Sequence, residues 1–165
     1  MGAGKSTVGR RLAHRLNLPF VDSDDEIVKA ADCSISDIFE IYGEDEFRAL
    51  EKRVIERLLA EGPMVLATGG GAFINTQTRK RILAASTAIW LNASLDVLVE
   101  RTSRRGGRPL LADKNPKNIL KKLIDERYPV YANAHIMIDT NEDSMDHTVD
   151  KIMNALNTEI TEKQS

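Results

Sequence analysis

The residues with the clearest chemical capacity stand first in the chain: Met1-Gly2-Ala3-Gly4-Lys5-Ser6-Thr7. They match the second half of the P-loop pattern G-x-x-x-x-G-K-[ST], in which the backbone N–H groups of a glycine-rich turn surround phosphate oxygens. In that pattern Lys5 would reach the β- and γ-phosphates of a nucleotide, and the Ser6 hydroxyl would bind Mg²⁺. Apolar residues at helical spacing follow directly, so we expect an amphipathic helix whose N-terminus favours an anion. The alternative is a chance glycine-lysine turn that only caps a helix.

Two aspartates, Asp22 and Asp24, follow an apolar run that predicts a buried strand over residues 18–22. In a loop of extended chain, side chains two residues apart point the same way. One carboxylate could then hold water ligands of Mg²⁺ while the other accepts a hydrogen bond from a substrate hydroxyl. The alternative is that these acids only stabilise the N-terminus of the helix expected over Glu26–Ala31.

Three consecutive glycines, Gly69-Gly70-Gly71, follow a second predicted strand over residues 64–68. Glycine costs backbone entropy, so a run of three needs a use. One use is a tight turn from strand to helix. The other is a backbone surface that a small polar ligand can approach closely. The sequence leaves both open.

Two arginines lie on or beside the apolar stripes of predicted helices, where a charged side chain is unusual. Arg127 continues the apolar stripe of a helix predicted over 116–128, and a buried arginine is rare unless paired. It would pair with a core carboxylate or bind a substrate carboxylate through two hydrogen bonds. Arg48, at the edge of another apolar stripe, favours the same interpretation more weakly.

A further group of arginines brackets two glycines: Arg101, Arg104, Arg105 and Arg108. The loop over 104–113 could be a solvated basic segment or a nucleic-acid patch. The absence of interleaved aromatic residues and a net charge of −2 argue against nucleic acid. A mobile lid that brings arginine onto a transferring phosphate fits better.

The elements that would position these residues alternate between strand and helix. Four strands are expected over 18–22, 64–68, 87–91 and 135–138, which predicts a parallel α/β sheet covered on both faces. Ligands bind beyond the carboxyl ends of such strands, where most of the candidate residues fall. A chain of 165 residues is one domain in size, so we expect a single domain over 1–165 with a frayed tail from about residue 158.

Composition describes a soluble globular protein, with 42% hydrophobic and 29% charged residues and a pI near 6.0. We expect neither nucleic acid nor membrane as a partner, because no apolar run is long enough to span a bilayer and the net charge is slightly acidic. There is one cysteine, Cys33, and no signal-peptide pattern. These features favour a cytoplasmic monomer.

With these residues in hand, the chain resembles the shikimate kinase family from Met1 to about Thr140. The segments that carry the resemblance are MGAGKST, LPFVDSD, GEDEFRALE, ATGGGA, WLNAS, GGRPLL and ERYPVY. The resemblance implies a three-layer P-loop kinase fold with five parallel strands in the order 2-3-1-4-5. It also implies phosphorylation of the 3-hydroxyl of shikimate by ATP with Mg²⁺, on the route to aromatic amino acids.

The resemblance also implies residue roles. For the nucleotide and its metal the residues are Gly2, Ala3, Gly4, Lys5, Ser6, Thr7, Asp22, Arg101 and Arg108. Ser6 would bind Mg²⁺ directly and Asp22 through water, while Arg101 would lie against adenine. For shikimate the residues are Asp24, Arg48, Gly69, Gly70, Gly71 and Arg127. The catalytic residues would be Lys5, Asp24 as the base, and Arg108 as the lid arginine.

The sequence departs from the family at its start, where a strand and a glycine normally precede MGAGKST. Either the sequence begins late or the protein lacks that strand, which is central to the family's sheet. We therefore expect the chain as written to fold poorly or to bind ATP weakly. The alternative functions are a related small-molecule kinase of the gluconate type and a non-catalytic nucleotide-binding module.

Overall fold

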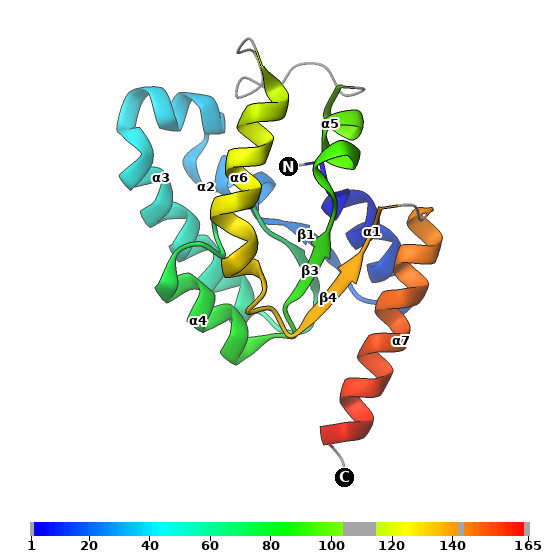
Figure 1. Ribbon diagram of the computed structural model, residues 1–165. Helices are drawn as coiled ribbons and strands as arrows, with labels where there is room; N and C mark the ends of the chain where they lie inside the picture. Colours follow the sequence, from blue (N-terminus) through cyan, green and yellow to red (C-terminus); the bar gives the residue numbers. More distant parts are fainter. Residues whose placement is uncertain (1, 104–114, 142–143, 164–165) are drawn as a thin grey trace. The chain divides into compact units, whose positions relative to one another are not determined.

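The computed structural model describes residues 2–103, 115–141 and 144–163, with side chains described as far as residue 158. Strands and helices alternate along these segments (Figure 1), as the sequence predicted. The strands are β1 (Phe20–Asp22), β2 (Val65–Ala67), β3 (Ile89–Asn92) and β4 (Ile136–Asp139). The helices are α1 (Lys5–Leu16), α2 (Ser23–Ala31), α3 (Ile35–Ala60), α4 (Thr76–Ala85), α5 (Leu95–Ser103), α6 (Pro116–Tyr131) and α7 (Met145–Lys163).

The chain divides into two compact units. One, called here the 9–87 unit, runs from Gly9 to Thr87. The other, called the 88–165 unit, also contains the first eight residues of the chain. The expectation of a single domain stays a prediction, and the expected lid over 104–113 lies outside the described residues.

Each unit contains one pair of parallel strands. In the 9–87 unit β1 pairs with β2, with Phe20 opposite Val65. In the 88–165 unit β3 pairs with β4, with Ile89 opposite Ile136. If β1–β4 are counted as strands two to five of the expected order 2-3-1-4-5, both pairings are those that the order requires.

The core of the 9–87 unit forms where α2 packs on α3. Its buried members are Ile27, Ile38, Phe47, Val54 and Leu58. Helix α3 begins with a capping box, in which the Ser34 hydroxyl accepts a hydrogen bond from the Asp37 N–H (3.1 Å) and the Asp37 carboxylate accepts one from the Ser34 N–H (3.2 Å). The helix is interrupted at Gly43, where φ is 83° and ψ is 175°. Glycine has a low helix propensity, and the helix breaks at this residue.

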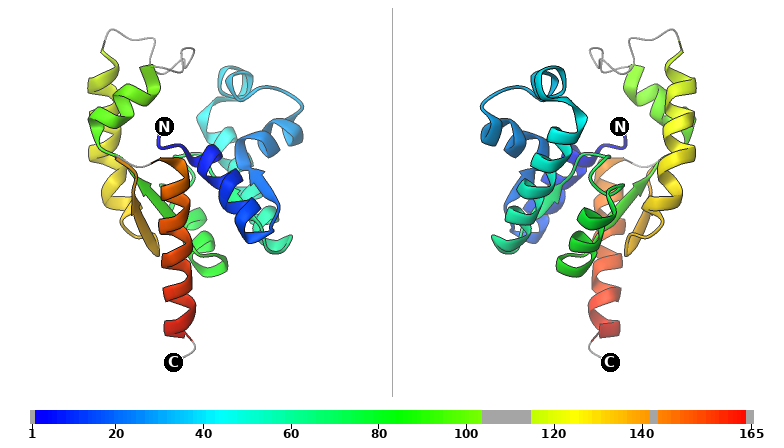
Figure 2. Two further views of the ribbon diagram at one scale, coloured as in Figure 1. Left: turned by 90° about the vertical axis from the view of Figure 1, so that its right-hand side faces the viewer. Right: turned by 90° about the vertical axis from the view of Figure 1, so that its left-hand side faces the viewer.

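The core of the 88–165 unit forms between α5 and α6, where Leu98 and Leu120 are buried around Ala93. On β4, Ile136 and Ile138 are buried, and α7 packs against this strand (Figure 2). Val149 and Ile152 of α7 are buried as well. Helix α7 continues to Lys163, beyond the end that the sequence predicted near Asn157. Within the described segments, no helix combines the length and hydrophobicity needed to cross a bilayer.

Candidate functional site

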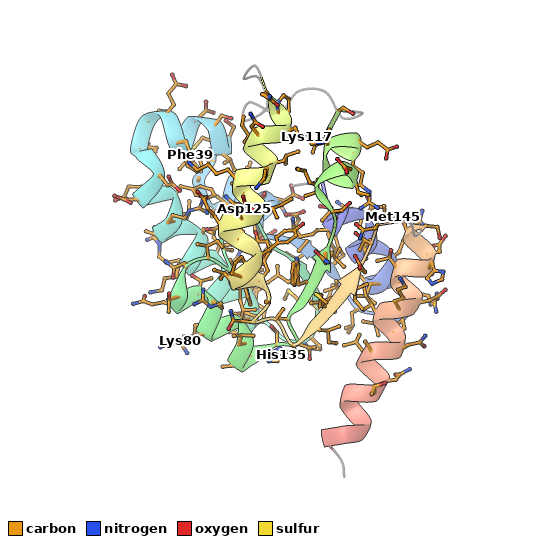
Figure 3. All side chains as sticks on the ribbon, in the orientation of Figure 1. Phe39, Lys80, Lys117, Asp125, His135 and Met145 are labelled. Atoms are coloured by element: carbon orange, nitrogen blue, oxygen red, sulfur yellow. The ribbon has the colours of Figure 1, made fainter. Side chains whose placement is uncertain are left out.

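The glycine turn at the N-terminus leads directly into α1, as the sequence predicted. Gly2 (φ 74°) and Gly4 (φ 84°) both adopt left-handed backbone conformations that favour glycine. The turn is also crowded. A Cβ at Gly2 would lie 3.0 Å from Cγ2 of Thr102, and one at Gly4 would lie 3.4 Å from Sδ of Met145, which is marked in Figure 3.

The first turn of α1 consists of Lys5, Ser6 and Thr7, and the Val8 N–H donates to the Gly4 carbonyl (2.9 Å). The first N–H groups of a helix have no partner within the helix, so this end of α1 offers donors and a positive dipole to an anion. Ser6 is exposed, and Lys5 and Thr7 are half-buried. A glycine turn with a lysine and a hydroxyl at a helix N-terminus fits nucleotide phosphates and their Mg²⁺.

Arg101 on α5 is attached to the end of β4 in the same unit. Its Nη2 donates to the Thr140 carbonyl (2.6 Å) and its Nη1 to the Thr140 hydroxyl (3.3 Å). Thr140 is buried, and its hydroxyl donates to the Asn92 carbonyl at the end of β3 (2.9 Å). The guanidinium is therefore fixed beside the carboxyl ends of both strands. Its contact with adenine stays a prediction.

Asp22 is the N-cap of α2, because its Oδ1 accepts a hydrogen bond from the Asp24 N–H (3.1 Å). The sequence predicted a loop here, with the helix beginning only at Glu26. That prediction is wrong, because the Asp22 cap starts the helix at Ser23 and places Asp24 in its first turn. The capping geometry agrees with the alternative interpretation of these acids. It does not test the water-mediated contact of Asp22 with Mg²⁺, which stays a prediction.

The glycine loop lies against carboxylates at its first residue. A Cβ at Gly69 would lie 3.1 Å from Oδ1 of Asp24 and 3.2 Å from Oε1 of Glu51. The Gly69 N–H donates to the hydroxyl of Ser23, which is fully buried between the two aspartates (3.3 Å). The backbone of Gly69 therefore lies beside the start of α2, and a side chain at this position would be tightly packed against Asp24.

The third glycine lies against an arginine. A Cβ at Gly71 would overlap the guanidinium of Arg48, with only 2.6 Å to Cζ. Gly70 and Gly71 belong to a turn in which the Ala72 N–H donates to the Gly69 carbonyl (3.1 Å). The tight turn that the first interpretation requires is present. The close approach in the structure is to side chains of the protein, so approach of a ligand to the three glycines stays a prediction. The 9–87 unit therefore brings together Asp24, Arg48 and the glycine loop.

Arg48 on α3 is held by two carboxylates of its own helix. Nη1 donates to Oε2 of Glu51 (2.7 Å), while Nε (3.4 Å) and Nη2 (3.2 Å) both face Oε1 of Glu44. Burial opposes the charge of the guanidinium, but the hydrogen bonds and charges of Glu51 and Glu44 outweigh it and raise the pKa of Arg48. The guanidinium also lies 5.0 Å from the centroid of the Phe47 ring.

Glu51 belongs to the site but was not predicted from the sequence. It is buried, with only 3% of its surface exposed, and it joins the ion pair with Arg48 to the contact with Gly69. A signal was present in the sequence, because Glu51 stands four residues after Phe47 and three before Val54, within the apolar stripe of α3. A carboxylate at an inward position needs a charged or polar partner.

Arg127 lies half-buried on α6 of the 88–165 unit, next to the core residues Leu120 and Ile124. It makes no hydrogen bond and no ion pair with any residue that the structure describes. The expectation that it simply pairs with a core carboxylate is therefore not supported within the described segments. Arg108, the expected lid arginine, lies outside the described residues.

A shallow depression of about 300 Å³ lies elsewhere in the 88–165 unit, between α6 and the ends of β3 and β4. No residue predicted from the sequence lines it. Its polar groups are already paired, since Lys121 pairs with Asp125 (2.7 Å) and the side-chain carbonyl of Asn141 accepts the Ser94 N–H (2.6 Å).

Comparisons with known proteins agree with one another. A family profile described as shikimate kinase matches residues 1–157. The shikimate kinase of Brucella canis is 50% identical over 165 residues, covering 100% of this chain and 82% of that protein. The shikimate kinase of Mesorhizobium japonicum is 48% identical over 156 residues, covering 94% of this chain and 77% of that protein.

Solved structures give the same result. The shikimate kinase from Acinetobacter baumannii in complex with shikimate matches with a TM-score of 0.90 and 38% identity, over 96% of this chain and 89% of that chain. A gluconokinase from Sinorhizobium meliloti matches with a TM-score of 0.65 and 19% identity, over 100% of this chain and 93% of that chain. At that identity the second likeness concerns the fold alone.

Proposed function

The chain belongs to the shikimate kinase family, and we propose how its residues divide the transfer of a phosphoryl group from ATP to the 3-hydroxyl of shikimate. The observation that carries the proposal is the cluster of Asp24, Arg48 and the glycine loop in the 9–87 unit. A carboxylate, a guanidinium and an open backbone surface are the groups needed to bind a small acid that also bears hydroxyls.

The N-terminal turn and α1 hold the nucleotide. The residues that bind its phosphates are Gly2, Ala3, Gly4, Lys5, Ser6 and Thr7. The Ser6 hydroxyl would hold Mg²⁺, with Asp22 acting through water. Mg²⁺ neutralises charge that develops on the transferring phosphoryl group. Arg101 orients the adenine, and Arg108 of the lid acts on the phosphates; the support for this last role is the resemblance alone.

The 9–87 unit supplies most of the groups that handle the acceptor, and Arg127 comes from the 88–165 unit. Asp24 accepts the proton of the attacking hydroxyl, a role that requires direct hydrogen bonding to that hydroxyl. Arg48 and Arg127 bind the carboxylate of shikimate, and Gly69, Gly70 and Gly71 leave room for its ring. Because phosphoryl transfer demands little covalent chemistry from a protein, positioning by these groups contributes most of the catalysis.

We also propose an oligomeric state, a compartment and the absence of macromolecular partners for the enzyme. It acts as a monomer in the cytoplasm, with neither nucleic acid nor membrane as a partner. The single cysteine supports a reducing compartment, and the net charge of −2 argues against nucleic acid and anionic membrane as partners. Light scattering coupled to size-exclusion chromatography tests the monomer, and a second species at micromolar concentration would contradict it.

The test of function is the release of ADP, measured by a coupled assay with shikimate, with gluconate and without acceptor. It is run on this chain and on one carrying the preceding segment of a relative. We expect release that depends on shikimate, and loss of that release in Asp24→Asn. ATP binding without release under any condition would support the non-catalytic module instead, and preference for gluconate would support the related kinase.

A further inference from the structure

The two carboxylates that hold Arg48 differ in how firmly they are placed. Glu51 is 3% exposed and its bond to Nη1 is short, at 2.7 Å. Glu44 is 66% exposed, and its bonds to Nη2 and Nε are longer, at 3.2 and 3.4 Å. Glu44 also follows Gly43 directly, at the break in α3. Glu51 is thus an anchor of the guanidinium, and Glu44 is a partner that water can replace.

Glu44 binds the edge of the Arg48 guanidinium that carries Nε and Nη2. Nε and Nη2 carry two parallel N–H groups, which is the geometry that binds a carboxylate through two hydrogen bonds. A single oxygen of Glu44 faces both of these groups. Any substrate carboxylate that bound Arg48 through this edge would meet a position that is already occupied by a carboxylate.

The negative charges around Arg48 make it unfavourable for Glu44 and a substrate carboxylate to bind the guanidinium at the same time. Asp24 and Glu51 both lie against Gly69, and Glu51 and Glu44 both pair with Arg48. A substrate carboxylate added to this group without displacement would bring another negative charge to a guanidinium that already has two partners. Like charges this close repel each other, so the carboxylate with the weaker hold must leave.

We propose that Glu44 is an internal competitor of the acceptor's carboxylate, which occupies the Nε–Nη2 edge of Arg48 until substrate displaces it. The inference rests on the proposed function, in which Arg48 binds that carboxylate. Glu44 keeps the guanidinium aligned before substrate arrives. It also makes binding selective, because an acceptor without a carboxylate gains nothing in exchange for displacing it.

The test compares Glu44→Gln with Glu46→Gln. Both changes keep the size of the side chain and remove one negative charge from the same helix. Glu46 is exposed and has neither a hydrogen bond nor an ion pair with the described residues, so it controls for charge alone. Exposed ion pairs one helical turn apart are weak, so the KM for shikimate should fall about twofold in Glu44→Gln. The KM for ATP and kcat should stay the same, and Glu46→Gln should behave as the unaltered chain.

The carboxamide of shikimate, which lacks the negative charge, gives the second arm. Glu44→Gln should improve binding of the acid and not of the carboxamide, measured as competitive inhibition against shikimate. An equal improvement for both ligands would overturn the proposal, as would a higher KM for shikimate or a value equal to that of Glu46→Gln. Absence of shikimate phosphorylation both in the unaltered chain and in the chain that carries the preceding segment of a relative is a different result, because it refutes the proposed function itself.

Discussion

Replacing Gly71 with alanine tests the arrangement of the acceptor site most directly. The new Cβ would lie 2.6 Å from Cζ of Arg48, whereas ordinary contacts of this kind begin at 3.4 Å. Nη1 would lie closer still, so the guanidinium has to withdraw by roughly 1 Å, although Glu51 holds Nη1 at 2.7 Å. Gly71 does not have a positive φ, so the backbone itself accepts alanine. The perturbation is thus confined to the position of Arg48.

The size of the effect follows from the bond that is lost. A hydrogen-bonded charged pair contributes about 1.5–3 kcal/mol, so misplacing Arg48 should raise the KM for shikimate by roughly 10- to 100-fold. The KM for ATP should stay the same, because neither Gly71 nor Arg48 is among the residues proposed to bind the nucleotide. Steady-state kinetics with each substrate varied in turn measure both values, and thermal unfolding confirms that the variant is folded.

Gly69→Ala provides a matched comparison. Its Cβ would lie 3.1 Å from Asp24 and 3.2 Å from Glu51, so the neighbours need to move by only a few tenths of an ångström. Because Asp24 is the proposed base, the main effect should be a lower kcat. If Gly71→Ala folds normally and leaves the KM for shikimate within a factor of two, the placement of the carboxylate on Arg48 is wrong.

Three further predictions concern charge and backbone. Glu51→Gln should raise the KM for shikimate and lower the free energy of unfolding by about 1–3 kcal/mol in urea titrations, because Arg48 loses its buried partner; an unchanged KM would limit Glu51 to a structural role. Gly4→Ala should weaken ATP binding measured by calorimetry, because φ at this position is 84°; unchanged affinity would contradict the role of the turn. Hydrogen bonds from Lys29 and then Arg57 lower the pKa of Glu26, so its contribution to stability is present above the pKa of the unfolded chain and is lost as the pH falls through the lower folded value. Glu26→Gln should remove that small acid dependence from unfolding curves recorded between about pH 3 and 6, and identical curves would refute it.

Much of the fold could be predicted because local signals agree with the tertiary structure. The helix break at Gly43, the capping box at Ser34 and the turn into α1 depend on a few neighbouring residues, and all three are present. The start of α2 was predicted wrongly for the opposite reason. Asp22 can end a strand and cap a helix with the same side chain, so no loop is needed between β1 and α2.

The sequence identified most residues of the candidate site, but not the contacts between them. Parallel strands bring their carboxyl ends to one edge, which indicated that Asp24 and the glycine loop would lie close together. Nothing in the sequence gives the distance from Gly71 to Arg48, because that depends on how α3 is placed over the loop. Glu51 was missed because a glutamate in an amphipathic helix usually faces solvent.

The glycines of this chain are needed for two separate reasons, room and handedness. Gly71 needs room, since any Cβ there meets Arg48. A Cβ at Gly43 would have nothing within 4 Å of it, yet a φ of 83° with a ψ of 175° is strained for every L-amino acid. The mirror image of that conformation is ordinary extended backbone, so a D-alanine introduced by chemical synthesis would fit without strain. D-alanine would also lower the conformational entropy of the unfolded chain. At the Gly43 break in α3, a residue of the opposite chirality should therefore stabilise the protein.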